Sequence, residues 1–67
     1  MKLEEALAEI RCKPVVDLWP VVGVVLDMSR GSVYQAARNG DIDTIRVGHR
    51  IKAITEPLRK RLGINAA

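Results

Sequence analysis

Residues 29–40 read SRGSVYQAARNG, and they predict a short helix that begins and ends on recognisable signals. Ser29 is one of the residue types that cap a helix N-terminus by accepting a hydrogen bond from a free backbone N–H. Asn39-Gly40 supplies the left-handed residue that ends many helices. We expect one helix between these two signals, and the rest of the chain is interpreted outward from it.

The two faces of this helix differ in chemistry. The inner face is small and apolar at i, i+3 and i+4, which allows close docking on a partner helix; it consists of Val33, Ala36 and Ala37. Arg30, Gln35 and Arg38 point elsewhere, and these side-chain types make bidentate contacts with guanine and adenine in the DNA major groove. We interpret the segment as a recognition helix; the alternative is an ordinary surface helix with solvated charges.

The composition limits what the chain can be. Its 67 residues predict one domain, and a chain of this size buries only about 60% of the surface that its unfolded form exposes. With no Phe, the core is expected to consist of Val, Ile, Leu and Ala around Trp19. The single cysteine, Cys12, excludes an intramolecular disulfide and is expected to serve as a small apolar side chain. His49 is its only conceivable metal-binding partner, so we expect no metal and no cofactor.

No segment has the signature of a membrane span or a signal peptide. The longest apolar run, residues 15–26, contains a charged residue and a proline and is shorter than the roughly 20 residues that a span needs. The first ten residues contain three glutamates where a signal peptide has a cationic region and an apolar stretch. We therefore expect a cytoplasmic protein without a membrane contact.

Charge is unevenly distributed along the chain. Residues 1–29 hold three basic and five acidic residues, whereas residues 30–67 hold eight basic and three acidic ones. An isoelectric point near 9.5 with the excess charge in one half is typical of a domain that presents a basic face to a polyanion. The alternative is a basic segment that serves solubility alone, but here the cations lie within patterned segments and form no tail.

The N-terminal segment, residues 1–13, predicts an amphipathic helix. Its apolar residues follow the i, i+3, i+4, i+7 spacing, with glutamates opposite; they are Leu3, Ala6, Leu7 and Ile10. Lys13-Pro14 ends the helix, because the residue before a proline avoids the helical region. This helix either covers the core or contacts another copy of the protein.

The next stretch is harder to assign. Residues 15–19 fit a short extended segment or an edge strand, and Asp17-Leu18-Trp19-Pro20 resembles a helix start with proline in the first turn. The four valines of residues 21–26 favour a strand by propensity. The lack of alternation and an i, i+3, i+7 stripe favour a helix instead; the stripe is Trp19, Val22 and Leu26. Gly23 would then lie where a second helix crosses closely.

Residues 18–40, linked through Asp27-Met28-Ser29, therefore predict a helix-turn-helix. Gly48-His49 lies between two β-branched runs, which predicts a hairpin over residues 43–54 whose tip projects as a wing. Thr55 is expected to cap a last helix, residues 55–63, that ends at Gly63. The predicted fold is a single domain, residues 1–67, mainly α with a small β-hairpin.

Three elements are expected to converge on one ligand: the recognition helix, the tip of the hairpin and the basic terminal helix. The candidate DNA contacts on the helix are Ser29, Arg30, Ser32, Tyr34, Gln35 and Arg38, and those on the wing are Arg46, His49, Arg50 and Lys52. Cations on the wing and the terminal helix would neutralise phosphates while the helix reads bases. For Tyr34 the alternative is a half-buried structural role. Catalysis is not expected, because the only histidine has no nearby carboxylate to orient it.

Residues 29–34, 38–42 and 45–51 together resemble a known family. They are similar to the pattern SRxTVY…xxGxI…xRVGxRxxI of small excisionase-type proteins with a MerR-like winged helix-turn-helix, over roughly residues 18–62. The resemblance implies that the helix after Ser29 enters the major groove and that the loop around His49 contacts the backbone or minor groove. This chain departs from the pattern at Asp27, where the turn usually holds glycine.

The resemblance also implies a biological role. Such proteins bind side by side on attachment-site DNA in bacterial cells, bend it, and bias an integrase toward excision. The expected partners are double-stranded DNA, further copies of the protein bound cooperatively, and a tyrosine or serine integrase. A small phage or mobile-element transcription regulator is the alternative. A third hypothesis is a protein-interaction adaptor that uses the apolar stripe of residues 1–11.

Overall fold

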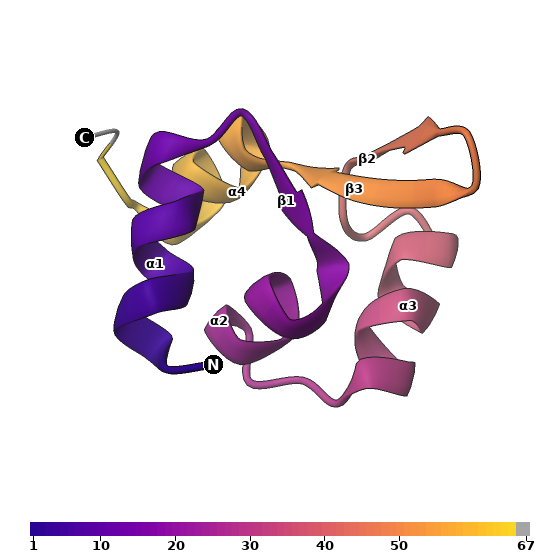
Figure 1. The fold of residues 1–67 in the computed structure, drawn as a ribbon, viewed down its shortest axis with the longest axis horizontal. Helices are drawn as coiled ribbons and strands as arrows, with labels where there is room; N and C mark the ends of the chain where they lie inside the picture. The colour runs from indigo at the N-terminus through magenta and orange to yellow at the C-terminus, as the bar shows by residue number, and fades with distance from the viewer. Residues whose placement is uncertain (66–67) are drawn as a thin grey trace.

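Helices pack around a small antiparallel sheet in the computed structural model, which describes residues 1–65 (Figure 1). In chain order the elements are α1 (Leu3–Cys12), β1 (Val15–Asp17), the helical segment η1 (Leu18–Val22), α2 (Gly23–Val25), α3 (Arg30–Arg38), β2 (Thr44–Val47), β3 (Arg50–Ile54) and α4 (Thr55–Leu62). Four α-helices and three strands within residues 1–65 make this a mixed α/β fold.

The expected hairpin is present, and a third strand joins it. β2 and β3 pair antiparallel with Val47 opposite Arg50, and Gly48-His49 forms the two-residue turn between them. β1 pairs with the other edge of β3, so the strand order is β1-β3-β2. Of the two possibilities for the segment after Pro14, the edge strand is correct. The predicted small hairpin is therefore part of a three-stranded sheet within a fold that is still richer in helix than in strand.

The valine-rich run is helical, as the missing alternation predicted, but the helix begins later than expected. Trp19 has extended dihedral angles (φ −129, ψ 132), so the continuous helical run starts only after it, at the cis Trp19-Pro20 peptide bond. Trp19 therefore does not share a helical stripe with Val22. Gly23 lies under the Trp19 ring and not at a helix crossing, because a Cβ there would lie 2.4 Å from Trp19 Cε3.

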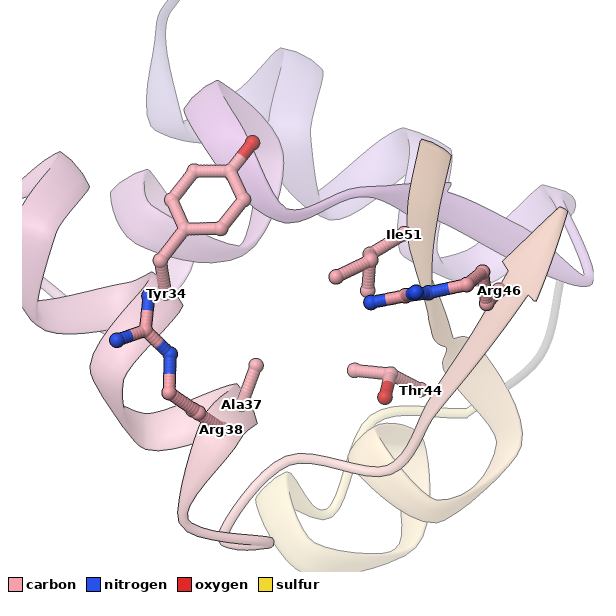
Figure 2. Close-up of a pocket in the computed structure, with 6 residues that line it drawn as sticks. All are labelled: Tyr34, Ala37, Arg38, Thr44, Arg46 and Ile51. Atoms are coloured by element: carbon pink, nitrogen blue, oxygen red, sulfur yellow. The ribbon is translucent and has the colours of Figure 1, made fainter. Parts of the chain in front are cut away.

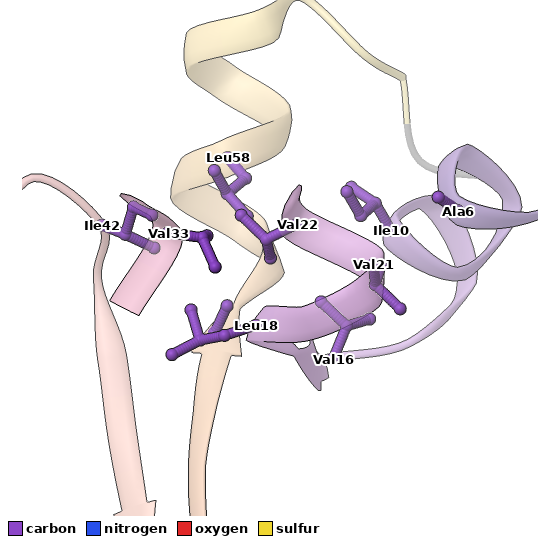
Figure 3. Packing of buried hydrophobic residues seen from close by; sticks show 10 residues of the cluster. Ala6, Ile10, Val16, Leu18, Val21, Val22, Val33, Ile42 and Leu58 are labelled. Atoms are coloured by element: carbon purple, nitrogen blue, oxygen red, sulfur yellow. The ribbon is translucent and has the colours of Figure 1, made fainter. Parts of the chain in front are cut away.

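The core is aliphatic (Figure 3). Its buried side chains are Ala6, Ile10, Val16, Leu18, Val21, Val22, Val33, Ile42, Ala53 and Leu58. Trp19 was expected to be the largest side chain anchoring this core but is 38% exposed. Successive side chains of an extended backbone point to opposite sides, so Leu18, 1% exposed, takes the inward position and Trp19 faces outward. Cys12 is also exposed, which corrects its assignment as an apolar side chain.

α1 covers one end of the core. Ala6 and Ile10 are fully buried, and α1 packs on η1, α2 and α4. Leu3, from the same predicted stripe, remains 52% exposed. The helix ends at Cys12, and Lys13 is extended, as the following proline requires. The apolar stripe of this helix is thus used mainly inside the molecule.

Thr55 links the first and the last helix of the chain. It was expected to cap α4, but Ile54 occupies the cap position, and Thr55 is 0% exposed within the helix. Its hydroxyl lies 2.5 Å from the Lys13 carbonyl oxygen and 2.9 Å from that of Pro14, and it accepts a hydrogen bond from Arg59 Nη1 at 2.8 Å. Arg59 Nη1 also donates to the Ile10 carbonyl at 2.8 Å. This network ties α4 to the end of α1.

The ends of α3 follow the sequence signals. The Ser29 hydroxyl oxygen accepts a hydrogen bond from the Ser32 backbone N–H at 3.2 Å, which confirms the cap. Gly40, after the last turn, has φ 85. In the preceding turn Asp27 has φ 55, a left-handed conformation that aspartate tolerates better than most residues.

Replacing Ser29 with alanine is expected to lower the free energy of unfolding by about 1 kcal/mol, because the Ser32 N–H loses its acceptor at the helix end. Urea denaturation followed by circular dichroism measures the effect. Ser29→Asp retains an acceptor and is the control, expected within a few tenths of a kcal/mol of the wild type. Equal midpoints for the alanine and wild-type proteins would contradict a capping role.

Candidate nucleic-acid interface

α3 presents the two faces that its spacing predicts. Val33 is fully buried, and the helix packs through it on η1 and α2. The candidate contacts on the opposite face are solvent-exposed; they are Ser29, Arg30, Ser32, Gln35 and Arg38. Tyr34 is half-buried between the two faces. The chemistry that the sequence placed on this helix is therefore accessible from outside.

The hairpin carries its candidate contacts on two faces and at its tip. Arg46 is opposite Ile51, and Val47 is opposite Arg50, so the two arginines lie on different faces of the ribbon. Arg46, His49 and Arg50 are exposed. Lys52 differs, because it forms an ion pair with Asp17 of β1, and its side chain is only 24% exposed. Its charge is already balanced within the sheet.

A cleft of about 350 Å³ separates α3 from the hairpin (Figure 2). Tyr34, Ala37 and Arg38 line it from α3, and Thr44, Arg46 and Ile51 line it from the hairpin. Figure 2 shows the Arg46 side chain reaching from the strand toward α3 beside Ile51. Arginines thus occupy both walls, and none of the six lining residues carries a carboxylate. Such an arrangement favours an anion between the walls.

Thr44 and Ile51 were not singled out from the sequence, although the strand period contains the signal. Residues i and i+2 of a strand share a face. Thr44 therefore lies on the same side of β2 as Arg46, and Ile51 is the cross-strand neighbour of Arg46. Once the register of the β2–β3 hairpin is known, the alternation of side chains along the strands identifies the residues that line the hairpin wall of the cleft.

The terminal helix does not join this surface, contrary to the expected convergence. α4 lies beside α1 at one end of the molecule, and the turn between β2 and β3 lies at the other (Figure 1). The five residues of β3 separate them by about 16 Å at strand spacing. Its cations have partners inside the fold: Arg59 binds the Ile10 carbonyl, and Arg61 Nη1 donates to the Asp41 carbonyl at 2.8 Å.

Within residues 1–65, five arginines have no side-chain partner; one is Arg11 on α1, and the other four form the set considered below. Within residues 1–65, no ion pair or side-chain hydrogen bond involves Arg30, Arg38, Arg46 or Arg50. All four belong to α3 or the hairpin. The positive charge of the C-terminal half is therefore available on these two elements.

Other kinds of site were sought in the same part of the chain. No group of three His, Cys, Asp or Glu side chains within residues 1–65 is placed to share a metal ion. The described helices include none with the length and apolar character needed to cross a bilayer. Comparison of the chain with protein-family models, with curated proteins and with solved structures gives no match.

Proposed function

We propose that the protein binds double-stranded DNA as a winged helix-turn-helix protein. In this arrangement α2 and α3 are the helix pair, α3 enters the major groove, and the β2–β3 hairpin is the wing. The observation that carries the proposal is the set of arginines without an internal partner on α3 and the hairpin, which are Arg30, Arg38, Arg46 and Arg50. Unpaired cations on two adjacent projecting elements suit a duplex, which carries one negative charge per about 1.7 Å of its axis.

The dimensions of α3 support this placement. An α-helix with its side chains is about 10–12 Å in diameter, and the major groove is about 12 Å wide, so a helix such as α3 fits across it. Gln35 and Arg38 are exposed on it, and both have the donor geometry for base edges. Ser29 and Ser32 lie at its N-terminus, a position from which hydroxyls contact phosphates. The wing then supplies Arg46, His49 and Arg50 to the phosphate backbone beside the groove.

Within DNA-binding proteins, we assign the chain to the excisionase type. The support is the sequence resemblance over residues 29–51, together with the left-handed Asp27 at the turn position where that family usually has glycine. In this role the protein would bind attachment-site DNA in cooperating copies, bend it, and direct an integrase toward excision. An excision assay with the integrase of the same element tests the assignment. Site-specific binding without stimulation of excision would support a transcription regulator instead.

The apolar stripe on which the adaptor hypothesis depends is largely buried in the structure. The hypothesis required the apolar stripe of the N-terminal helix to be free for a partner, but Ala6 and Ile10 of that stripe are fully buried against the core. Of the stripe, only Leu3 is largely exposed. A flat dependence of DNA affinity on salt concentration would restore this hypothesis, because phosphate contacts make binding fall steeply with salt.

Alanine substitutions on the two elements are expected to behave differently. Arg38→Ala should weaken binding by about 1–3 kcal/mol and relax sequence preference, because a base-reading side chain is lost. Arg50→Ala should weaken binding to all sequences alike and reduce the salt slope by about one, because a phosphate contact is lost. Fluorescence anisotropy with a footprinted site and a scrambled duplex, at several salt concentrations, separates the two.

Lys60→Ala is the control for these variants. Lys60 is a well-exposed cation on α4, paired with Glu56 at 3.6 Å, and lies away from the proposed interface. Its removal should leave both affinity and salt slope unchanged. Identical behaviour of Arg38→Ala and Arg50→Ala would contradict the division between base and phosphate contacts.

A further inference from the structure

The only tryptophan and the only tyrosine of the chain lie outside the core, in one surface depression. A second cleft, of about 370 Å³, is lined by Asp17, Trp19, Tyr34, His49, Arg50 and Ile51. It shares Tyr34 and Ile51 with the cleft between α3 and the hairpin. The two clefts therefore meet at these two side chains, and we call the pair of clefts the trench.

Trp19 is held in place although it is exposed. Its six-membered ring lies against Gly23, which is buried and has no side chain, and an added Cβ there would lie 2.4 and 2.6 Å from Trp19 Cε3 and Cζ3. The missing side chain thus provides the space that the ring occupies. The largest apolar side chain of the chain stays 38% exposed while aliphatic residues fill the core. A fixed, half-exposed aromatic side chain of this kind is typical of a binding surface.

The trench combines this aromatic surface with positive charge. Arg38 and Arg46 line one cleft, and His49 and Arg50 line the other. The one carboxylate in the lining, Asp17, is paired with Lys52. A ligand with regularly spaced anionic groups and apolar faces between them matches this arrangement. A sugar–phosphate backbone has both features, since each phosphate is followed by a deoxyribose.

We propose that the trench holds the sugar–phosphate backbone of one strand of the duplex, with Trp19 as a DNA contact. Arg46 binds a phosphate in the first cleft, where Arg38 extends from the cleft wall to the bases, and His49 and Arg50 bind a phosphate in the second. Trp19 and Tyr34 pack against the deoxyribose rings between them. This inference rests on the proposed function, because it specifies how that duplex is held, and it adds a contact residue outside both α3 and the wing.

Trp19 itself reports the contact, because it is the only source of tryptophan fluorescence. The wild-type protein is titrated with a footprinted duplex, and acrylamide quenching is measured at saturation. We expect the quenching constant to fall about twofold or more, because the exposed ring becomes covered by a sugar. The single strand of the same sequence is measured in parallel.

Variants and modified DNA extend the test. Trp19→Ala should lower duplex affinity about tenfold, Trp19→Phe should recover most of it, and Leu62→Ala is the matched control, an apolar side chain 41% exposed on α4. A series of duplexes, each with one uncharged methylphosphonate, should reveal a position at which the wild type loses affinity. Arg46→Ala should be insensitive to the substitution at that position, because its phosphate contact is already absent.

The outcomes separate the two proposals. Duplex binding with unchanged quenching of Trp19 overturns the trench contact and leaves the proposed function intact. Protection by the single strand alone also overturns it, in favour of a protein that stacks unpaired bases. No binding to any duplex overturns both proposals. The quenching measurement needs no substitution, so an unfolded Trp19→Ala protein would not prevent a decision.

Discussion

Replacing Thr55 with valine is expected to lower the free energy of unfolding by about 3 kcal/mol, although the two side chains have nearly the same shape. The hydroxyl lies between the carbonyls of Lys13 and Pro14 and the guanidinium of Arg59, and the residue is 0% exposed. Valine would remove three hydrogen bonds and leave the Lys13 carbonyl unpaired, and an unpaired group costs about 1–3 kcal/mol. The Pro14 carbonyl keeps the Thr55 backbone N–H, and Arg59 keeps the Ile10 carbonyl. Urea or thermal denaturation measures the loss. In a chain of 67 residues a loss of this size leaves little stability.

Two further substitutions identify the cause. Thr55→Ser retains the hydroxyl and should recover more than half of the loss. Thr44→Val makes the same chemical change on β2, where Thr44 is half-exposed and its hydroxyl forms no hydrogen bond with any of residues 1–65. It should change stability by less than about 0.5 kcal/mol. Equal losses for the valine variants at both positions would contradict the role of the buried network.

Replacing Gly23 with alanine is expected to cost about 2–3 kcal/mol, although alanine is the better helix former. The new Cβ would lie 2.4 Å from Trp19 Cε3 and 3.1 Å from the Met28 carbonyl oxygen. The carbonyl belongs to backbone that is itself hydrogen-bonded to Gly23, so the indole ring must move. Denaturation gives the loss, and a red shift of the tryptophan emission reports that the ring has moved into water.

Gly31→Ala is the matched control, because Gly31 is also helical and no atom lies within 4 Å of the position that an added Cβ would take. There the same substitution should stabilise the protein, by up to about 1 kcal/mol, through helix propensity. The two changes are thus expected to have opposite signs. A Gly23→Ala protein with wild-type stability and unchanged emission would show that the ring does not require the glycine.

Local signals predicted the ends of the elements well. The Ser29 cap, the left-handed Gly40 and Gly63, and the Gly48-His49 turn each depend on a few neighbouring residues, and each is present in the structure. The same holds for the helical assignment of the valine-rich run after Pro20. Propensity alone favoured a strand there, but the missing alternation indicated a helix.

The errors concern contacts between distant parts of the chain. Threonine is a common helix-capping residue, yet the Thr55 hydroxyl hydrogen-bonds to backbone carbonyls 41 and 42 residues earlier in the chain. Residues 15–17 form a strand because they pair with the edge of β3, and the sequence of neither segment alone indicates this pairing. From the sequence, Lys52 has the features of a wing cation. The fold places it beside Asp17, 35 residues earlier in the chain, and the ion pair between them was not predicted.

Trp19 illustrates why part of the candidate site was missed. Size and apolarity assign a lone tryptophan to the core, and in a helix its position would have been on the inward stripe. The extended conformation of this one residue reverses the direction of its side chain and places Leu18 inside instead. The reversal moves an aromatic ring from the interior to the trench, so the error about the core and the omission from the site have one cause.

The exposed thiol of Cys12 makes site-specific labelling possible without any mutation. It is the only cysteine, and it ends α1, at the opposite end of the molecule from the β2–β3 turn (Figure 1). A maleimide dye attached there would leave the arginines of α3 and the hairpin uncovered. Energy transfer from that dye to acceptors at either end of a short duplex would then report which way each copy faces along its site.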